Sequence, residues 1–281
     1  MTYTTITVKP LSPHLGAEIE GIDLAKPLSA AQFDDIHAAF LKHHVIFFHN
    51  QQLTPEQHIA FGKRWGTLNI HPYVKGMADH PEILEIIKEP SERINFGGGW
   101  HSDMSFLEVP ALGSILHAIE VPEVGGDTLF ASQYAAWEAL SPGLKQTLEK
   151  LRAIHSAAEE YGAQGASSRK RASMDSEVVG DDVPEYEHPV VRTHPETGRK
   201  GLYVNPAFTL RFAGWTRKES RPLLDYLFEV CRREAFTCRF RWRPGSLAMW
   251  DNRCVWHFAL NDYHGQRRHM RRVTVNGDKV R

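Results

Sequence analysis

Cysteine is scarce in this chain, whose 281 residues include only Cys231, Cys238 and Cys254. The number is odd and there is no Cys-x-x-Cys spacing, which argues against a disulfide framework and a thiolate zinc site. The beginning of the chain lacks a charged segment followed by an apolar core, and no run of about 18 apolar residues occurs anywhere. We therefore expect a cytoplasmic protein without a membrane anchor.

An excess of either charge is also missing, because 33 lysines and arginines stand against 34 aspartates and glutamates, for a net charge of −1. This balance gives no basis for a nucleic-acid scaffold or a polybasic membrane surface, so we expect a small molecule as partner. No Gly-x-Gly-x-x-Gly follows a strand, which disfavours a doubly wound α/β fold. Without repeats or an evident linker, we expect a single domain over residues 1–281.

Short predicted strands outnumber the predicted helices. Helices are expected from Ser29 to Leu41, from Thr54 to Gly66, and over 132–153 and 215–236. Strands are expected at 5–8, 16–22, 44–48, 83–87, 112–120, 128–130, 188–191, 200–204, 240–242, 247–250, 254–260 and 270–276. This order predicts a mainly β fold with helical additions, a cupin-like double-sheet jelly roll. Residues 156–187 show no periodicity and are predicted to form a lid or loop insertion.

The motif with the clearest chemical meaning is His101-Ser102-Asp103, which follows three glycines and Trp100. Residues i and i+2 of a strand face the same side, so His101 and Asp103 can share one metal ion. His257, at the end of a late apolar segment, would complete a triad. Two histidines and one carboxylate leave coordination positions open, which suits Fe(II) and dioxygen.

Two other histidines are rivals for the third ligand position. His264 falls in a polar connection and His269 follows it closely, whereas His257 ends an apolar strand that can reach the core. With 16 histidines in the chain, a surface position is the ordinary expectation for any one of them. We therefore predict that His264 and His269 lie at the surface.

Several segments together resemble one known family. They are Leu15-Gly16-Ala17-Glu18-Ile19, Trp100-His101-Ser102-Asp103, Gly125-Gly126-Asp127-Thr128-Leu129, Tyr203-Val204-Asn205-Pro206-Ala207-Phe208, Trp250-Asp251-Asn252-Arg253, and Gln266-Arg267-Arg268 through Arg272. The chain thus resembles the taurine dioxygenase (TauD/TfdA) family of Fe(II)- and 2-oxoglutarate-dependent dioxygenases over nearly its whole length. The resemblance implies a distorted double-stranded β-helix, which is a jelly roll, with Fe(II) as metal and 2-oxoglutarate and O2 as cosubstrates.

A cosubstrate site is expected at Arg268, which follows His257 closely enough for the next strand of a hairpin to return it beside the metal. A guanidinium suits a carboxylate because its rigid fork donates two parallel hydrogen bonds. The resemblance implies that Arg268 binds the distal carboxylate of 2-oxoglutarate and that Thr128 adds a hydroxyl donor.

Arg272 points to an acidic substrate. In a regular strand it shares a face with Arg268, and a second inward cation is costly to bury without an anion. The resemblance implies that Arg272 binds the substrate, and that a pocket is formed by His71, Tyr73, Met104 and Phe208, for which core packing is an equal alternative. The family's sulfonate-binding example differs at Gly97 and after the His-Pro pair, so sulfonates, sulfate esters, aryloxy acids and other small carboxylates all stay open.

The implied reaction is oxidative decarboxylation of 2-oxoglutarate to succinate and CO2, coupled to hydroxylation of a substrate carbon. Hydroxylation next to a heteroatom leads to cleavage. Asp103 favours hydroxylation over halogenation, because the halogenating relatives lack this carboxylate. The alternatives are a metal-dependent hydrolase, which would not need Arg268 and Thr128, and a non-catalytic jelly-roll binding protein. Relatives commonly form dimers or tetramers, so we expect a homo-oligomer.

Overall fold

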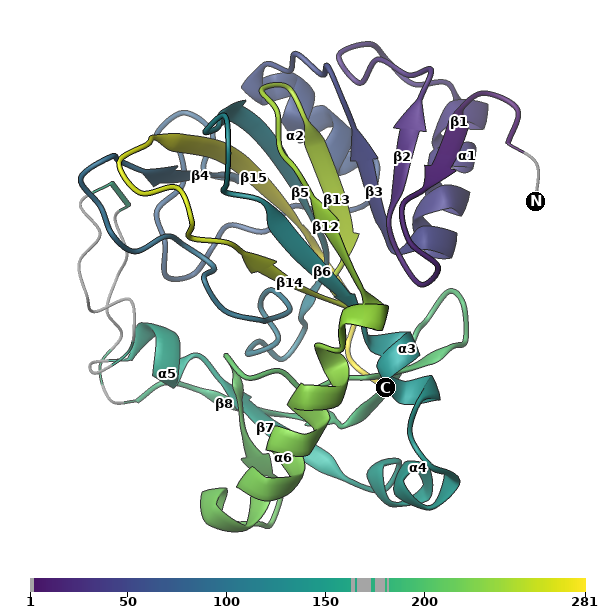
Figure 1. Ribbon diagram of the computed structural model, residues 1–281, viewed down its shortest axis with the longest axis vertical. Coiled ribbons are helices and arrows are strands. Elements are labelled where there is room, and N and C mark those ends of the chain that lie inside the picture. Colours follow the sequence, from purple (N-terminus) through teal and green to yellow (C-terminus); the bar gives the residue numbers. More distant parts are fainter. Residues whose placement is uncertain (1–2, 163–164, 166–172, 175–179, 181) are drawn as a thin grey trace.

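Two facing β-sheets form the centre of the molecule (Figure 1). The computed structural model describes residues 3–162, 165, 173–174, 180 and 182–281. The major sheet has the order β1 (Thr7–Pro10), β2 (Ala17–Glu20), β3 (Val45–Phe48), β13 (Leu247–Asp251), β5 (Ala111–Glu120), β15 (Arg268–Asn276), β4 (Ile83–Lys88). The minor sheet has the order β12 (Thr237–Phe240), β6 (Thr128–Ser132), β14 (Val255–Ala259).

Large apolar side chains fill the space between these sheets. Phe47 of the major sheet stacks on Phe240 of the minor sheet with ring centroids 4.0 Å apart, and its edge meets Phe130 at 5.6 Å. Trp250 and Met270 belong to the same buried cluster. Two facing sheets whose inward side chains form one shared core are typical of a jelly roll. The predicted mainly β fold is therefore confirmed.

Helices cover the outer face of the major sheet. α1 (Ala30–His43) and α2 (Pro55–Lys63) each begin with a capping box, at Ser29 and Thr54 as the sequence predicts. Ile36 and Phe40 of α1 join a second core with Phe48 of the sheet behind them. The other helices of the described residues are α3 (Gln133–Glu138), α4 (Pro142–Leu148), α5 (Ala158–Tyr161), α6 (Arg217–Cys231) and the 3₁₀ helix η2 (Glu234–Phe236). No helix in the described part of the chain is long and apolar enough to cross a bilayer.

Two small sheets lie beside α6, in the lower part of Figure 1. One has the order β11 (Thr209–Phe212), β7 (Arg152–Ser156), β8 (Glu185–Pro189), and the other pairs β10 (Lys200–Leu202) with β9 (Val191–Thr193). The prediction of a helical region over 132–153 is wrong at its end, where β7 begins. β7 carries alanine and histidine at its buried positions rather than large apolar residues, which hides its period of two.

The predicted lid over 156–187 coincides only partly with the described structure. Ser156 ends β7, α5 follows, and Glu185 already begins β8, which pairs with β7. Residues 163–164, 166–172, 175–179 and 181 lie outside the described residues. The three cysteines are free and buried, in agreement with the expectation of no disulfide framework.

Candidate active site

His101 and His257 are joined by an isolated antiparallel bridge. The backbone N–H of His101 donates to the carbonyl of His257 at 3.1 Å, and that of His257 donates back at 2.8 Å. His257 lies in the middle of β14, whereas His101 has only this bridge and Asp103 opens a run of turns. The predicted strand through His101 and Asp103 is therefore wrong. The next residue, Met104, has φ +58°, which turns the chain sharply after the carboxylate.

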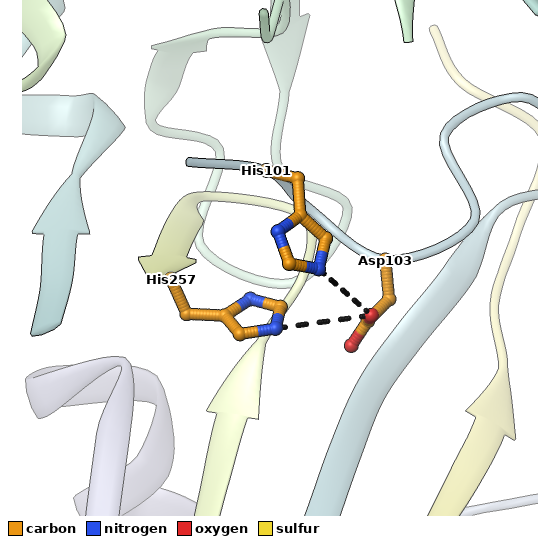
Figure 2. Close-up of side chains that lie close together, drawn as sticks. All are labelled: His101, Asp103 and His257. Carbon is orange, nitrogen blue, oxygen red and sulfur yellow. Dashed lines mark ion pairs between the residues drawn. The ribbon is translucent and has the colours of Figure 1, made fainter. Parts of the chain in front are cut away.

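The three predicted ligands nevertheless converge, as Figure 2 shows. Nε2 of His101 lies 3.5 Å and Nε2 of His257 lies 3.8 Å from the same oxygen, Oδ1 of Asp103. All three side chains are buried, and one donor atom from each lies within 4.8 Å of the other two. Side chains from a turn and from a distant strand thus form a cluster in which one metal ion could bind.

The protonation of these groups suits a divalent metal. Nδ1 of His101 lies 2.8 Å from the carbonyl of Gly99, to which it can only donate, so Nε2 is the nitrogen of this ring that is available to a metal. Burial and the neighbouring His101 lower the pKa of His257 well below its ordinary value, so its ring is neutral. Burial raises the pKa of Asp103, but Arg272 and the two imidazoles outweigh this effect and hold it well below its usual range. Two imidazole nitrogens and a carboxylate fit Fe(II).

A hydrogen-bond network fixes the carboxylate of Asp103. The hydroxyl of Ser114 donates to Oδ2 at 2.7 Å, and Arg272 donates to Oδ1 at 2.9 Å. Asn252 accepts the backbone N–H of Asp103 at 3.0 Å and donates to the Ser114 hydroxyl at 3.1 Å. Ser114 was not predicted as a site residue, and its only signal is a lone hydroxyl within an apolar strand.

A second group of metal-binding residue types, His194, Asp251 and Cys254, lies nearby, but its donors are already engaged. Both oxygens of Asp251 accept hydrogen bonds from the Arg253 guanidinium. Nδ1 of His194 accepts two backbone N–H groups, so Nε2 carries the proton and donates to Asp251 at 3.0 Å. This group anchors the turn between β13 and β14 and leaves no free ligand set.

Next to the triad lies a small space of about 30 Å³, hereafter the inner chamber, lined by His101, Thr128, Trp250, His257, Arg268 and Arg272 among others. Arg268 is buried, and its Nε and Nη2 atoms have no hydrogen-bond partner among the residues that the structure describes. The Thr128 hydroxyl accepts the Trp242 indole N–H at 2.9 Å and can still donate. A buried, unpaired guanidinium next to the metal ligands calls for an anionic occupant.

The predicted hairpin that would return Arg268 to the metal is wrong. β14 belongs to the minor sheet, whereas β15, which Arg268 opens, pairs with β5 and β4 of the major sheet. The connection crosses from one sheet to the other, so His257 and Arg268 face each other across the jelly roll. The prediction that Arg268 and Arg272 share a face of one strand is confirmed, since both line the inner chamber.

In front of the triad is a cleft of about 470 Å³, hereafter the outer cleft, lined by His71, Phe96, Met104, Phe106, Phe208 and Arg272 among others. Nδ1 of His71 accepts two backbone N–H groups at 3.1 Å. Burial, helped by Arg272, lowers the pKa of His71 to about 3, so its ring is neutral and its proton sits on Nε2. Four of the five predicted substrate residues thus line the outer cleft.

Tyr73 is the exception, because it packs behind the outer cleft against Phe106 and Tyr161 at centroid distances of 5.7 and 5.0 Å. Trp100 and Phe258 also line the cleft and were not predicted. Neither rival histidine belongs to the metal-ligand cluster. His264 is exposed, as predicted, whereas the prediction of a surface position is wrong for His269, whose side chain is only 13% exposed and forms a hydrogen bond with Glu85 at 3.0 Å.

Comparison with known proteins agrees with this geometry. The family model described as "Taurine catabolism dioxygenase TauD, TfdA family" matches residues 7–274. An alkylsulfatase of Acinetobacter baylyi is 36% identical over 97% of this chain and 86% of its own length. An alpha-ketoglutarate-dependent sulfate ester dioxygenase of Pseudomonas putida is 34% identical over 97% of this chain and 90% of its own. A crystal structure from Burkholderia xenovorans, titled as a putative alpha-ketoglutarate-dependent taurine dioxygenase, has a TM-score of 0.82 and 38% identity, covering 97% of this chain and 93% of that one.

Proposed function

Because this chain belongs to the TauD/TfdA family and is an Fe(II)- and 2-oxoglutarate-dependent dioxygenase acting on a small anionic substrate, we propose that this substrate is an organic sulfate ester with an apolar chain. The hydrolase and the non-catalytic binding protein find no support among the relatives. The observation that carries the proposal is the outer cleft, in which polar donors lie at the metal end and aromatic walls extend beyond them.

In this proposal His101, Asp103 and His257 bind Fe(II). With 2-oxoglutarate and O2, the bound metal supplies the oxidant that removes hydrogen from a substrate carbon and returns hydroxyl. The protein holds the ligand set in place, with Ser114 on the second oxygen of Asp103 and the Gly99 carbonyl on His101. Rigid ligands that keep their lone pairs free leave the remaining positions of the metal to the cosubstrates.

The inner chamber takes 2-oxoglutarate. Arg268 offers two unpaired N–H groups to its distal carboxylate, and the Thr128 hydroxyl adds a third donor. Arg268 lies across the chamber from His257, so a molecule bound there directs its keto acid end to the metal ligands. Apolar residues complete the walls and exclude water from the reacting atoms.

The outer cleft takes the sulfate ester. Arg272 has a buried, unpaired Nε, and the protonated Nε2 of His71 is a second donor for the sulfate oxygens. An anion held by these two residues beside Asp103 brings the carbon attached to the ester oxygen close to the metal. Hydroxylation of that carbon gives a hemiacetal sulfate, which breaks its C–O bond to yield an aldehyde and inorganic sulfate. Phe106, Phe208 and other aromatic rings bury the remaining chain.

The test compares matched substrates with the same apolar chain. Hexyl sulfate, hexanesulfonate and heptanoate are each supplied with Fe(II), 2-oxoglutarate and O2, together with phenoxyacetate as an aryloxy acid. We expect succinate, hexanal and sulfate to appear in equal amounts with hexyl sulfate, at a higher kcat/KM than for the other three. Succinate release that depends on a sulfonate or an aryloxy acid, but not on the sulfate ester, would overturn the proposal.

Several expectations from the sequence stay predictions. They are cytoplasmic localisation, a homo-oligomer, a single domain over 1–281 and the lid over 156–187. The assignment of Tyr73 to substrate binding also stays a prediction, and in this structure it would act through Phe106 and Tyr161 rather than by lining the outer cleft. Light scattering after size-exclusion chromatography measures the oligomeric state directly.

A further inference from the structure

Lys88 lies directly opposite Arg268 in the major sheet. The register pairs Lys88 of β4 with Arg268 of β15, then Ile86 with Met270 and Leu84 with Arg272. Alternate residues of a strand share a face, so Lys88 is on the interior side with Ile86, which lines the inner chamber. The side chains of Lys88 and Arg268 therefore leave neighbouring strands on the same interior face, beside the inner chamber that Arg268 lines.

Within the described part of the chain, the ammonium group of Lys88 has no charged partner. Lys88 is 3% exposed, and no described residue forms a hydrogen bond or an ion pair with its Nζ. Its one contact of note is the ring of Tyr263, whose centroid lies 4.5 Å from Nζ. Burial lowers the pKa of Arg268, and the carboxylate of Asp127 raises it in part. Oδ2 of Asp127 accepts a hydrogen bond from Arg239 at 2.6 Å, but neither of its oxygens bonds to Lys88.

Two buried like charges on opposed positions destabilise a sheet unless an anion compensates them. Packing on the Tyr263 ring offsets this cost only in part, because a cation–π contact stabilises less than the burial of an unpaired charge destabilises. Arg268 also lacks partners for two of its nitrogens. Among the described residues no carboxylate bonds to Lys88 or to these two nitrogens of Arg268, so the pair can accept a carboxylate from a ligand.

We propose that Lys88 and Arg268 form a two-cation seat for the distal carboxylate of 2-oxoglutarate. The inference rests on the proposed function, because that function supplies the cosubstrate. Arg268 binds the carboxylate through its planar guanidinium. The flexible Lys88 side chain moves from its position over the Tyr263 ring and adds a second positive charge. The seat selects a 2-oxo acid with a second carboxylate over one that ends in a methyl group.

The experiment measures binding in the absence of turnover. The probe is N-oxalylglycine, which keeps both carboxylates of 2-oxoglutarate and is bound with Mn(II) in a structure 30% identical to this chain, with a TM-score of 0.79. Calorimetry with the Mn(II)-loaded protein compares the natural chain with Lys88→Met, which keeps the length of the side chain and removes its charge. Lys145→Met is the matched control, because Lys145 also lies over an aromatic ring, that of Trp137, but on the surface.

We expect Lys88→Met to weaken N-oxalylglycine binding about tenfold or more, the size of a lost charged hydrogen bond, and Lys145→Met to leave it unchanged. Without ligand, Lys88→Met melts no lower than the natural chain, because an uncompensated buried charge is gone. Lys88→Arg keeps most of the affinity. Binding of 2-oxopentanoate, which lacks the distal carboxylate, is equal in the natural chain and in Lys88→Met.

Equal binding of N-oxalylglycine by the natural chain and Lys88→Met would overturn the seat while the dioxygenase assignment stands. An equal loss for 2-oxopentanoate would also overturn it, because the lysine would then act on the fold rather than on the carboxylate. Should Lys88→Met fail to fold, Lys88→Gln repeats the comparison with a polar, uncharged end. Failure of the natural chain to bind N-oxalylglycine at all would overturn the proposed function and the seat together.

Discussion

Replacing Ser114 with alanine tests how the metal ligands are held. The Ser114 hydroxyl is fully buried, donates to Oδ2 of Asp103 at 2.7 Å and accepts from Asn252 at 3.1 Å. Its removal leaves a carboxylate oxygen and an amide N–H without partners in a site closed to water. A hydrogen bond to a charged group contributes about 1.5–3 kcal/mol. Loss of such a bond behind a metal ligand typically lowers metal affinity roughly 10- to 100-fold.

The assay is a calorimetric titration of the metal-free protein with Mn(II), next to urea unfolding of the same samples. Ser220→Ala is the matched control, since Ser220 is also fully buried and makes two hydrogen bonds, to Phe212 N–H and the Thr216 carbonyl, far from the metal. We expect both variants to lose stability and only Ser114→Ala to lose metal affinity. If both bind Mn(II) as tightly as the natural chain, the Ser114 bond does not position Asp103 and the reasoning is refuted.

Three further outcomes are expected. Arg268→Met loses 2-oxoglutarate binding by more than about tenfold while it still binds Mn(II), as calorimetry with each ligand will show. Arg272→Ala raises the KM for the anionic substrate about 10- to 100-fold, whereas the affinity for 2-oxoglutarate stays largely intact. The same change weakens metal binding, because Arg272 also pairs with Asp103. Equal losses for substrate and 2-oxoglutarate would contradict the separate roles of Arg268 and Arg272. Stability falls as the pH drops from about 6.5 towards 3. Burial lowers the pKa of His58 to about 3, so in this range the unfolded chain binds a proton that the native chain does not bind. The loss of stability is roughly 2 kcal/mol at pH 5, and urea unfolding of His58→Gln must show a shallower pH dependence.

The metal ligands could be predicted from the sequence because their chemistry is local to two short motifs. His101, Asp103 and His257 converge as expected, although the reason given for it, a strand through the first two, is not the one the structure uses. Instead, a single backbone bridge between His101 and His257 and a turn at Met104 bring the three ligands together. A prediction of metal ligands from residue type can hold although the predicted backbone conformation is wrong, because several backbone conformations bring the same side chains together.

What supports the ligands was harder to predict, since it depends on which strands become neighbours. Ser114 reaches Asp103 only because β5 lies beside β13 in the major sheet, and nothing in its own segment indicates that pairing. Lys88 ends a strand, where a lysine ordinarily reaches solvent, and only the register with Arg268 places it inside. Arg272 was predicted to need an anion, and in the structure part of that need is met by Asp103.

The central claim is that His101, Asp103 and His257 hold Fe(II) with positions open for 2-oxoglutarate. Absorption spectroscopy under anaerobic conditions tests it most directly, by adding Fe(II) and then 2-oxoglutarate to the natural chain and to His257→Ala. The account predicts a weak visible charge-transfer band in the natural chain that is absent from the variant. No band in the natural chain, together with zinc-dependent hydrolysis of the sulfate ester without O2, would contradict it.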